Sequence, residues 1–260
     1  MDNAPLVLSG SSLSTFLRCG KQWEYAYVLN VKRPPNIRQL VGLATHEAIE
    51  VDMRHKLEAR ENLPIDDIVD AYSDAFDRDA PGVEPDDEEQ DLGSAKDSGV
   101  SLVRIHREHV GATVQPVLVE EQVQFEVNGI PFSGYLDLVD EDENIRDTKT
   151  SARKLDPENY RLTMTGYAIG FRQMGVEQGI DYNETIENGI VLDGLIRTKK
   201  PYYQREELTI DQNDIRRFAS VVETVNAAIN EGTFIPNGLV SGACGWCGYA
   251  DICPAYRSSR

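Results

Sequence analysis

The chain has 260 residues, 40% of them apolar, so it can bury a substantial core and is expected to be globular and not disordered. Its formal net charge of −18 argues at first sight against a nucleic-acid partner, because phosphate binding needs concentrated positive charge. The charge is unevenly distributed, however: residues 83–92 hold six acids and no base, whereas "RTKKPYYQR" (197–205) is basic and aromatic. The net charge therefore weakens the hypothesis of a nucleic-acid partner without excluding it.

The hydrophobic runs are too short to span a bilayer, and the first residues lack the basic flank of a secretory signal. We therefore expect a cytoplasmic protein without a membrane partner. In a reducing compartment, clustered cysteines more often bind metal or do redox chemistry than form disulfides.

The first third of the chain is predicted to be helical. Ser11 or Ser12 is expected to cap a first helix that has Cys19 in its middle. The residues expected on the apolar side of this helix are Leu13, Phe16, Leu17 and Trp23. Further helices are predicted at about 39–60, 64–79 and 95–111, with an acidic loop at 81–94.

The pattern then changes to strands. Residues 114–127 and 130–139 alternate in hydrophobicity on either side of Asn128-Gly129, a strong tight-turn signal. The remaining predicted elements are a strand at 144–150, a helix from about 157 capped by Asp156, strands at 188–196 and 202–209, a helix at 212–230 opened by Asp211, and a loop-like tail at 236–260. This order predicts an α/β fold with a mixed central sheet flanked by helices.

Two carboxylates and a lysine are predicted to converge on neighbouring strands. Asp147 and Lys149 are two residues apart, so their side chains share one side of the strand. A hairpin symmetrical about residue 142 would place Asp137 opposite Asp147. Such close carboxylates repel each other unless a cation or proton lies between them, and Mg²⁺ or Mn²⁺ would relieve the repulsion. An Asp-x-Lys triplet on an ordinary solvated strand face remains the alternative.

His46 lies on the predicted helix at 39–60, in "VGLATHEAIE". A lone helical histidine is more often a partly buried polar residue than a ligand. The small residues Gly42 and Ala44 just before it would let this helix approach another element closely, which makes a site position plausible.

The four cysteines have a three-plus-one spacing. Cys244, Cys247 and Cys253 fall within ten residues, whereas Cys19 lies 225 positions before the first of them. Structural zinc usually takes two ligands from each of two short knuckles, whereas a bulky iron–sulfur cluster accepts sulfurs from separate segments. The spacing therefore favours a cluster over zinc, and such a cluster would join the tail to the first helix.

The pieces together resemble a known family. "SSLSTFLRCGKQWEYAYV", "VGLATHEAIE", "GYLDLV", "RDTKT" and "CGWCGYADIC", in this order, resemble the RecB-like PD-(D/E)xK nucleases that carry a [4Fe–4S] cluster. This group includes the Cas-four nucleases of CRISPR adaptation systems, their phage-encoded relatives and the AddB nuclease domain. The resemblance implies a restriction-endonuclease-like core at 39–232 within a single nuclease domain, 1–260, and a cluster region formed by 9–31 and 236–260.

The resemblance also assigns roles to residues. It implies Asp137, Asp147 and Lys149 as catalytic residues, and it places His46, Asp137, Asp147 and Thr148 at the metal site. It implies Cys19, Cys244, Cys247 and Cys253 as cluster ligands. Of the family's Gln-x-x-x-Tyr motif, Tyr167 matches the tyrosine, but Thr163 stands where glutamine is expected. Either Arg161 or Gln173 compensates for the missing glutamine, or DNA contact at this position is weaker.

The function that follows is a Mn²⁺- or Mg²⁺-dependent deoxyribonuclease, mainly a single-stranded DNA exonuclease with endonuclease activity as an addition. It would act in the cytoplasm of a prokaryotic cell or a phage-infected host, alone, as a homo-oligomer or with a recombination or CRISPR adaptation partner. The alternatives are a non-catalytic nucleic-acid-binding or assembly module and a zinc-stabilised interaction protein. The residues expected on the DNA path, besides Tyr167, are Arg197, Lys199, Lys200, Tyr202, Tyr203 and Arg205.

Overall fold

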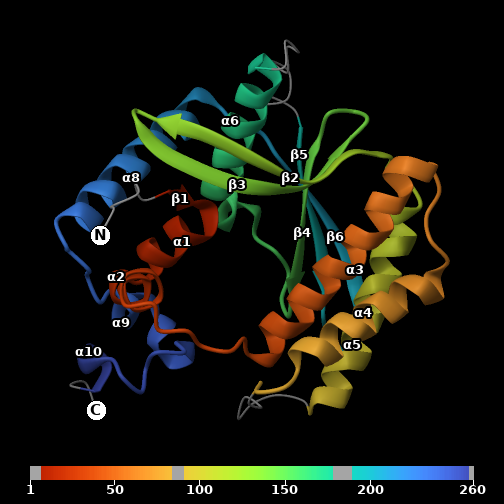
Figure 1. The fold of residues 1–260 in the computed structure, drawn as a ribbon, viewed down its shortest axis with the longest axis horizontal. Helices are drawn as coiled ribbons and strands as arrows, with labels where there is room; N and C mark the ends of the chain where they lie inside the picture. Colours follow the sequence, from red (N-terminus) through yellow and green to blue (C-terminus); the bar gives the residue numbers. More distant parts are fainter. Residues whose placement is uncertain (1–6, 84–90, 178–188, 258–260) are drawn as a thin grey trace.

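The computed structural model describes residues 7–83, 91–177 and 189–257, so most of the acidic stretch at 83–92 lies outside the described residues. A six-stranded mixed sheet with helices on both faces forms the centre, which confirms the predicted fold class (Figure 1). The strands are β1 (Leu8–Ser9), β2 (Pro116–Val127), β3 (Ile130–Asp140), β4 (Ile145–Ser151), β5 (Ile190–Ile196) and β6 (Tyr202–Leu208). The longer helices are α1 (Gly10–Arg18), α3 (Ile37–Ala59), α4 (Ile65–Asp79), α5 (Leu92–His106), α6 (Arg161–Glu177) and α8 (Gln212–Asn230).

Strand β3 organises the sheet. One edge of β3 pairs with β2 in the antiparallel hairpin closed by Asn128-Gly129, as predicted. Its other edge pairs in parallel with β1 at Phe132 and Ser133, and antiparallel with β4 at Leu138 and Val139. Among the described residues, positions 134–137 of β3 have no strand paired on this second edge. That interval is where the candidate site forms.

The N-terminal helix departs from the prediction. Its cap is Ser9, which shares a capping box with Ser12, and not Ser11 or Ser12. The helix ends at Cys19, whose backbone is extended (φ −164°, ψ 112°), so Cys19 separates α1 from α2 (Gly20–Trp23) and does not lie in the middle of one helix. Leu17 is 42% exposed and therefore does not belong to the apolar side, whereas Leu13 and Trp23 are buried.

Other helices begin and end close to where the sequence places them. Asn36 caps α3 with a capping box to Gln39, and Asp211 caps α8 with Asp214. Asp156 caps a short 3₁₀ helix, Pro157–Asn159, which leads into α6. The tail contains short helical segments: α9 (Gly238–Ser241), a 3₁₀ turn (Ala243–Trp246) and α10 (Pro254–Arg257). No helix in the described residues is both long enough and apolar enough to cross a membrane.

The β2–β3 hairpin bends sharply at Glu120. On a regular strand, residues two positions apart point to the same side. Here Leu138 packs in the core formed with α3, α4 and α5, whereas Leu136 packs in a second core with α6. Glu120 has a left-handed backbone (φ 49°) at the same level, although the pairing register continues across it from Val119 to Glu121. The bend carries the hairpin away from α3 and leaves a corner at Glu120.

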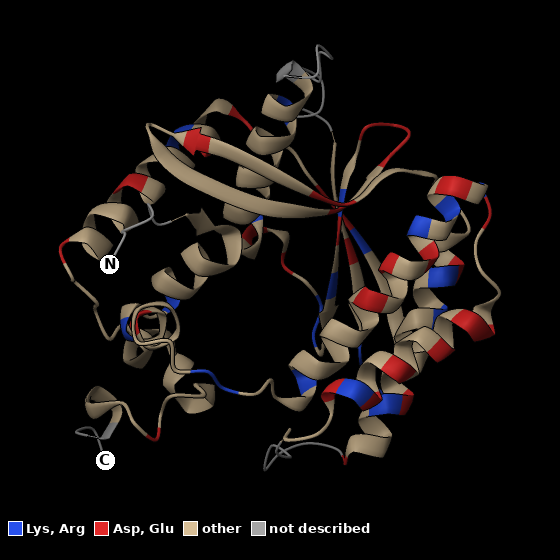
Figure 2. Cartoon of the chain, in the orientation of Figure 1, with Lys and Arg blue, Asp and Glu red and all other residues tan. Residues whose placement is uncertain are grey.

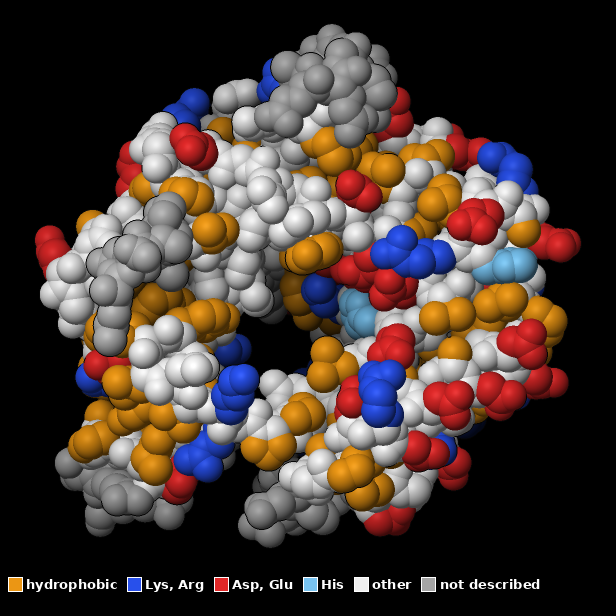
Figure 3. Space-filling model, viewed as in Figure 1, with side chains coloured by type: hydrophobic (Ala, Val, Ile, Leu, Met, Phe, Trp, Pro, Cys, Tyr) orange, Lys and Arg blue, Asp and Glu red, His pale blue; other side chains and the backbone are white. Residues whose placement is uncertain are grey.

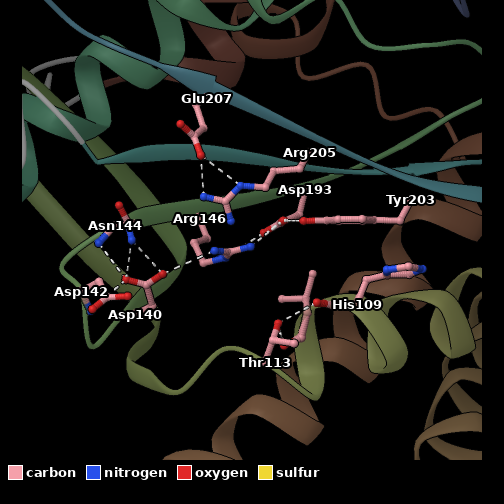
Figure 4. A network of polar contacts seen from close by, with 11 residues as sticks. His109, Thr113, Asp140, Asp142, Asn144, Arg146, Asp193, Tyr203, Arg205 and Glu207 are labelled. Carbon is pink, nitrogen blue, oxygen red and sulfur yellow. Dashed lines mark hydrogen bonds and ion pairs between the residues drawn. The ribbon is translucent and has the colours of Figure 1, made fainter.

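A buried polar network joins β4, β5 and β6 behind this corner (Figure 4). The Arg146 guanidinium donates two hydrogen bonds to Asp193, at 2.7 and 3.0 Å, and one to Asp140 at 3.4 Å. The Tyr203 hydroxyl donates to Asp193 at 2.5 Å, and the His109 ring stacks on the Tyr203 ring with centroids 4.9 Å apart. Because Arg146 directly precedes Asp147, this network fixes the strand that carries the candidate site.

We expect Asp193→Ala to destabilise the protein by about 3–5 kcal/mol, because it leaves the buried Arg146 without its main counter-charge. The matched control is Arg205→Ala, which breaks the exposed ion pair with Glu207 and should cost less than about 1 kcal/mol. Urea unfolding of both variants measures the difference. Equal free energies of unfolding would show that the network contributes little to stability.

Candidate active site

One imidazole and two carboxylates meet at the corner of the sheet. His46 on α3, Glu120 on β2 and Asp137 on β3 each offer a ligand atom, and these atoms all lie within 4.8 Å of one another. His46 Nδ1 lies 3.5 Å from Asp137 Oδ2. The same oxygen accepts a hydrogen bond of 2.9 Å from the backbone N–H of Thr148. Thr148 therefore orients Asp137 through its backbone.

Glu120 was not predicted from the sequence. Its position follows from the tight turn at 128–129: Val119 pairs with Leu138 and Glu121 with Leu136, so Glu120 lies opposite Asp137. The turn at 128–129 is a signal in the sequence from which this position can be predicted. The hairpin between β3 and β4 relates only Asp137 to Asp147 and gives no position for Glu120.

The pairing predicted between β3 and β4 is confirmed where the two strands form a ladder. Leu138 pairs with Arg146 and Val139 with Ile145, as a hairpin symmetrical about residue 142 requires. The ladder stops before it reaches Asp137 and Asp147. In its place, the Asp137 carboxylate accepts the Thr148 N–H, so the strands separate where the carboxylates lie.

Asp147 and Lys149 form a shielded ion pair beside this group. Asp147 is only 1% exposed. Lys149 Nζ donates to Asp147 Oδ1 at 2.9 Å and lies 2.7 Å from Oδ2, where the contact has the geometry of an ion pair and not of a hydrogen bond. Oδ2 is therefore a buried carboxylate oxygen whose counter-charge is the Lys149 ammonium, without a hydrogen bond of regular geometry. A divalent cation that bound Asp147 would share this carboxylate with Lys149 or displace the lysine from it.

The acids at this corner are crowded. Burial raises the pKa of Asp147 to about 7, with Asp137 adding to the effect and Lys149 opposing it. Burial and the charge of Asp137 likewise raise the pKa of Glu120 to about 7. Burial lowers the pKa of His46, which keeps its imidazole neutral and able to act as a ligand. Oxygen-rich and anionic, with a neutral imidazole, this group suits Mg²⁺ or Mn²⁺.

The region of the Gln-x-x-x-Tyr motif is arranged differently from the prediction. Tyr167 packs beside the site, since its ring leaves no room for a Cβ at Gly134, and burial raises its pKa to about 12. Thr163 instead contacts α1: its hydroxyl lies 3.4 Å from that of Ser14. Arg161 is committed to ion pairs with Glu158 and Asp214. Gln173 lies exposed, ten residues beyond Thr163 on α6.

The site borders an opening in the molecular surface. Figure 3 shows an opening near the centre of the molecule, with acidic and histidine side chains along one side of it. Figure 2 shows many acidic residues along α3, α4 and α5, whereas the half that contains α1 and the tail has fewer. The surfaces on the two sides of the opening therefore differ in charge.

The basic, aromatic stretch at 197–205 divides into two groups. Lys199, Lys200 and Tyr202 are exposed and remain candidates for DNA contact. Tyr203 belongs to the buried network, where Asp193 and His109 occupy its hydroxyl and one ring face. Arg205 is exposed but pairs with Glu207.

The four cysteines gather around one hollow. Cys19, Cys244, Cys247 and Cys253 line it together with Tyr25, Tyr249 and neighbouring residues, and all four are free of disulfides. A Cβ at Gly238 would lie 3.1 Å from Cys244 Sγ and 3.3 Å from Cys19 Sγ, so glycine is needed where the two sulfurs approach the backbone. Within the described ranges, no three of these sulfurs lie within 4.8 Å of one another.

Metal binding at the corner should be linked to protons. At pH 6 the raised pKa values of Glu120 and Asp147 keep both carboxyls largely protonated, so Mn²⁺ must displace protons and should bind more weakly than at pH 8. Glu120→Gln should lower the affinity and release about one proton fewer at pH 6. Calorimetry in buffers of different ionisation enthalpy measures both. Glu121→Gln, the exposed neighbour, is the control, and equal behaviour of the two variants would exclude Glu120 as a ligand.

Comparisons with known proteins identify the family of the chain. A search of curated proteins finds no match. A crystal structure from Eubacterium rectale, named "Putative exonuclease", shares 14% identity with a TM-score of 0.60, covering 98% of this chain and 88% of that one, and this likeness shows the fold alone. A second crystal structure, of SSO0001, is 15% identical and covers 93% of this chain and 95% of that one. Its TM-score of 0.37 is too low to support a conclusion about the fold. A model of the PD-(D/E)XK nuclease superfamily matches residues 7–254, nearly the whole chain, and the protein therefore belongs to this superfamily.

Proposed function

We propose that the protein is a divalent-metal-dependent deoxyribonuclease that acts mainly on single-stranded DNA, as an exonuclease with endonuclease activity as an addition. The observation that carries this proposal is the pair of Asp147 and Lys149 beside Asp137. A buried carboxylate paired with a lysine, next to a second carboxylate, combines a cation ligand with a group that can hold water.

Each residue of the corner has a distinct part in this proposal. Asp137, Asp147, Glu120 and the neutral His46 imidazole would hold the cation. A bound Mg²⁺ or Mn²⁺ supplies Lewis-acid activation of water and of the scissile phosphate. Lys149 carries its charge next to Asp147, because the two carboxylates raise its pKa above the usual range despite burial. From there it can orient the attacking water and stabilise the growing negative charge on the phosphate.

Two observations support a preference for DNA ends and for single-stranded DNA. The site borders the opening in Figure 3, and a strand that passes through such an opening needs a free end. Exposed Lys199 and Lys200 can neutralise phosphates, and exposed Tyr202 can stack on unpaired bases. Tyr203 is not included in this path because its hydroxyl and one ring face are already occupied.

We further propose that the hollow between the termini holds a [4Fe–4S] cluster. Four thiolates around one zinc lie about 3.8 Å apart, since each Zn–S bond is about 2.3 Å. In the described residues no three cysteine sulfurs lie within 4.8 Å of one another, a wider arrangement than one zinc ion requires, which favours a larger inorganic core. In this proposal the whole chain is one nuclease domain, in which residues 9–31 and 236–260 hold the cluster and 39–232 form the core.

Asp147→Asn should reduce cleavage of end-labelled single-stranded DNA in Mn²⁺ by at least about 100-fold, because it removes a cation ligand with little change in shape. Lys149→Met should keep Mn²⁺ binding and still lose about 10²- to 10⁴-fold in rate, because the group that orients the water is gone. Single-turnover cleavage and Mn²⁺ calorimetry on the same samples separate these two effects.

The matched control is Asp142→Asn, the same substitution at an exposed position in the turn between β3 and β4. It should cleave like the wild type. If Asp147→Asn cleaved as fast as Asp142→Asn, the carboxylates at the corner would be structural. If the wild type bound DNA without cleaving it, the protein would be a binding module.

Protein purified anaerobically should be brown and contain about four irons per chain, and Cys19→Ala should lose both the colour and the iron. The Cys19→Ala chain should still keep part of its tail contacts, because Asn237 bonds the backbone of Leu17 and Gly20 and Arg33 pairs with Asp251. Ser241→Ala, near the hollow, is the control and should keep the iron. If protein produced with ample iron contained stoichiometric zinc and no iron, the proposal of a cluster would be wrong.

A further inference from the structure

Beyond the bend, the β2–β3 hairpin has one buried and one exposed side. Val123, Phe125 and Phe132 are buried against α6 and α8. Gln122 and Gln124, which alternate with them on β2, are exposed. Antiparallel sheets commonly cover only one face in this way. The exposed side therefore begins directly at the corner where Glu120 lies opposite Asp137.

Tyr135 occupies the first position on this exposed side. It pairs with Gln122 across the hairpin, and the two residues lie two positions along their strands from Asp137 and Glu120. Two residues along a strand span about 6.8 Å, so the backbone of Tyr135 lies close to that of the candidate ligand Asp137. Tyr135 is 53% exposed, so its ring is open to a ligand from solvent.

The surface around Tyr135 carries no charge over several residues. Positions 122–125 on β2 and 131–136 on β3 contain no acidic or basic residue, although the chain as a whole has a net charge of −18. In Figure 3 the surface over β2 and β3 is mostly white, the colour of uncharged polar side chains and backbone. A nucleic-acid strand can lie here without the repulsion that the acidic helices would cause.

We propose that Tyr135 stacks on the base of the nucleotide next to the scissile phosphate, with Gln122 beside it to bond the same nucleotide. This inference rests on the proposed function and adds a base-binding position to it. Single-stranded DNA is the ligand that fits, because only unpaired bases expose a face to an aromatic ring. Stacking on Tyr135 would hold the end of the DNA strand while the scissile phosphate lies at Asp137.

Base stacking and phosphate contact predict different dependences of DNA affinity on salt concentration. Since the strip has no lysine or arginine, it releases no counterions from DNA when it binds. Loss of Tyr135 should therefore weaken binding equally at low and at high salt. Loss of Lys199 or Lys200, if these contact phosphates, should instead reduce the salt dependence.

The test uses 12-nucleotide single-stranded DNA and full-length protein in the Lys149→Met background with Mn²⁺, so that binding is measured without cleavage. Tyr135→Ala should weaken binding by about 5- to 150-fold, with an unchanged slope of affinity against salt, and Tyr135→Phe should bind nearly as well as the parent. Val117→Ala, another exposed residue of β2, is the matched control and should have no effect.

A series of the same oligonucleotides, each with one abasic position, identifies the stacked base. An abasic site at one position should weaken binding to the parent protein by a factor similar to that of Tyr135→Ala. The same abasic site should cause no further loss of affinity for the Tyr135→Ala protein. Equal affinities of Tyr135→Ala and Val117→Ala, or losses that simply add, would overturn the inference. Tyr135→Leu replaces Tyr135→Ala if the alanine variant does not fold.

Failure of this inference is distinct from failure of the proposed function. If the protein with Lys149 intact cleaves the oligonucleotide and Tyr135→Ala cleaves it with unchanged rate and affinity, only the stacking position is excluded. If the protein with Lys149 intact does not cleave any single-stranded DNA, the nuclease proposal fails first.

Discussion

The arrangement depends on negative charge crowded at the corner of the sheet. Asp137 and Glu120 lie opposite each other across one hairpin, and buried Asp147 adds a third carboxylate from the next strand. Burial, together with the charge of Asp137, raises the pKa of both Glu120 and Asp147 to about 7, and Lys149 only partly opposes this at Asp147. A divalent cation would relieve the remaining repulsion. The bend of β2, the contact of α3 through His46 and the ion pair of Arg146 with Asp193 all keep these groups together.

The fold as a whole follows from local signals. The Asn128-Gly129 turn, the alternation on either side of it and the caps at Asp156 and Asp211 place the strands and helices within a few residues. The pairing of β3 with β4 could be predicted for the same reason, because a short turn fixes the register. These signals act between neighbours in the sequence, which is why they can be recognised without a structure.

Other features depend on contacts between distant segments. Glu120 could have been found by counting across the first hairpin, but its left-handed backbone and the bend there have no local signal. Cys19 has the helical surroundings of α1 and α2, yet tertiary contacts with the tail hold its backbone extended. Tyr203 has the composition of a stacking residue, but its bond to Asp193, ten residues earlier on the neighbouring strand, commits it to the interior.

Anomalous diffraction from crystals grown with Mn²⁺ would show whether these carboxylates form one cation site. If they do, we expect one strong peak at the corner, within bonding distance of Asp137, Asp147 and at least one of His46 and Glu120. No peak at saturating Mn²⁺, with Lys149 still bridging both oxygens of Asp147, would contradict it.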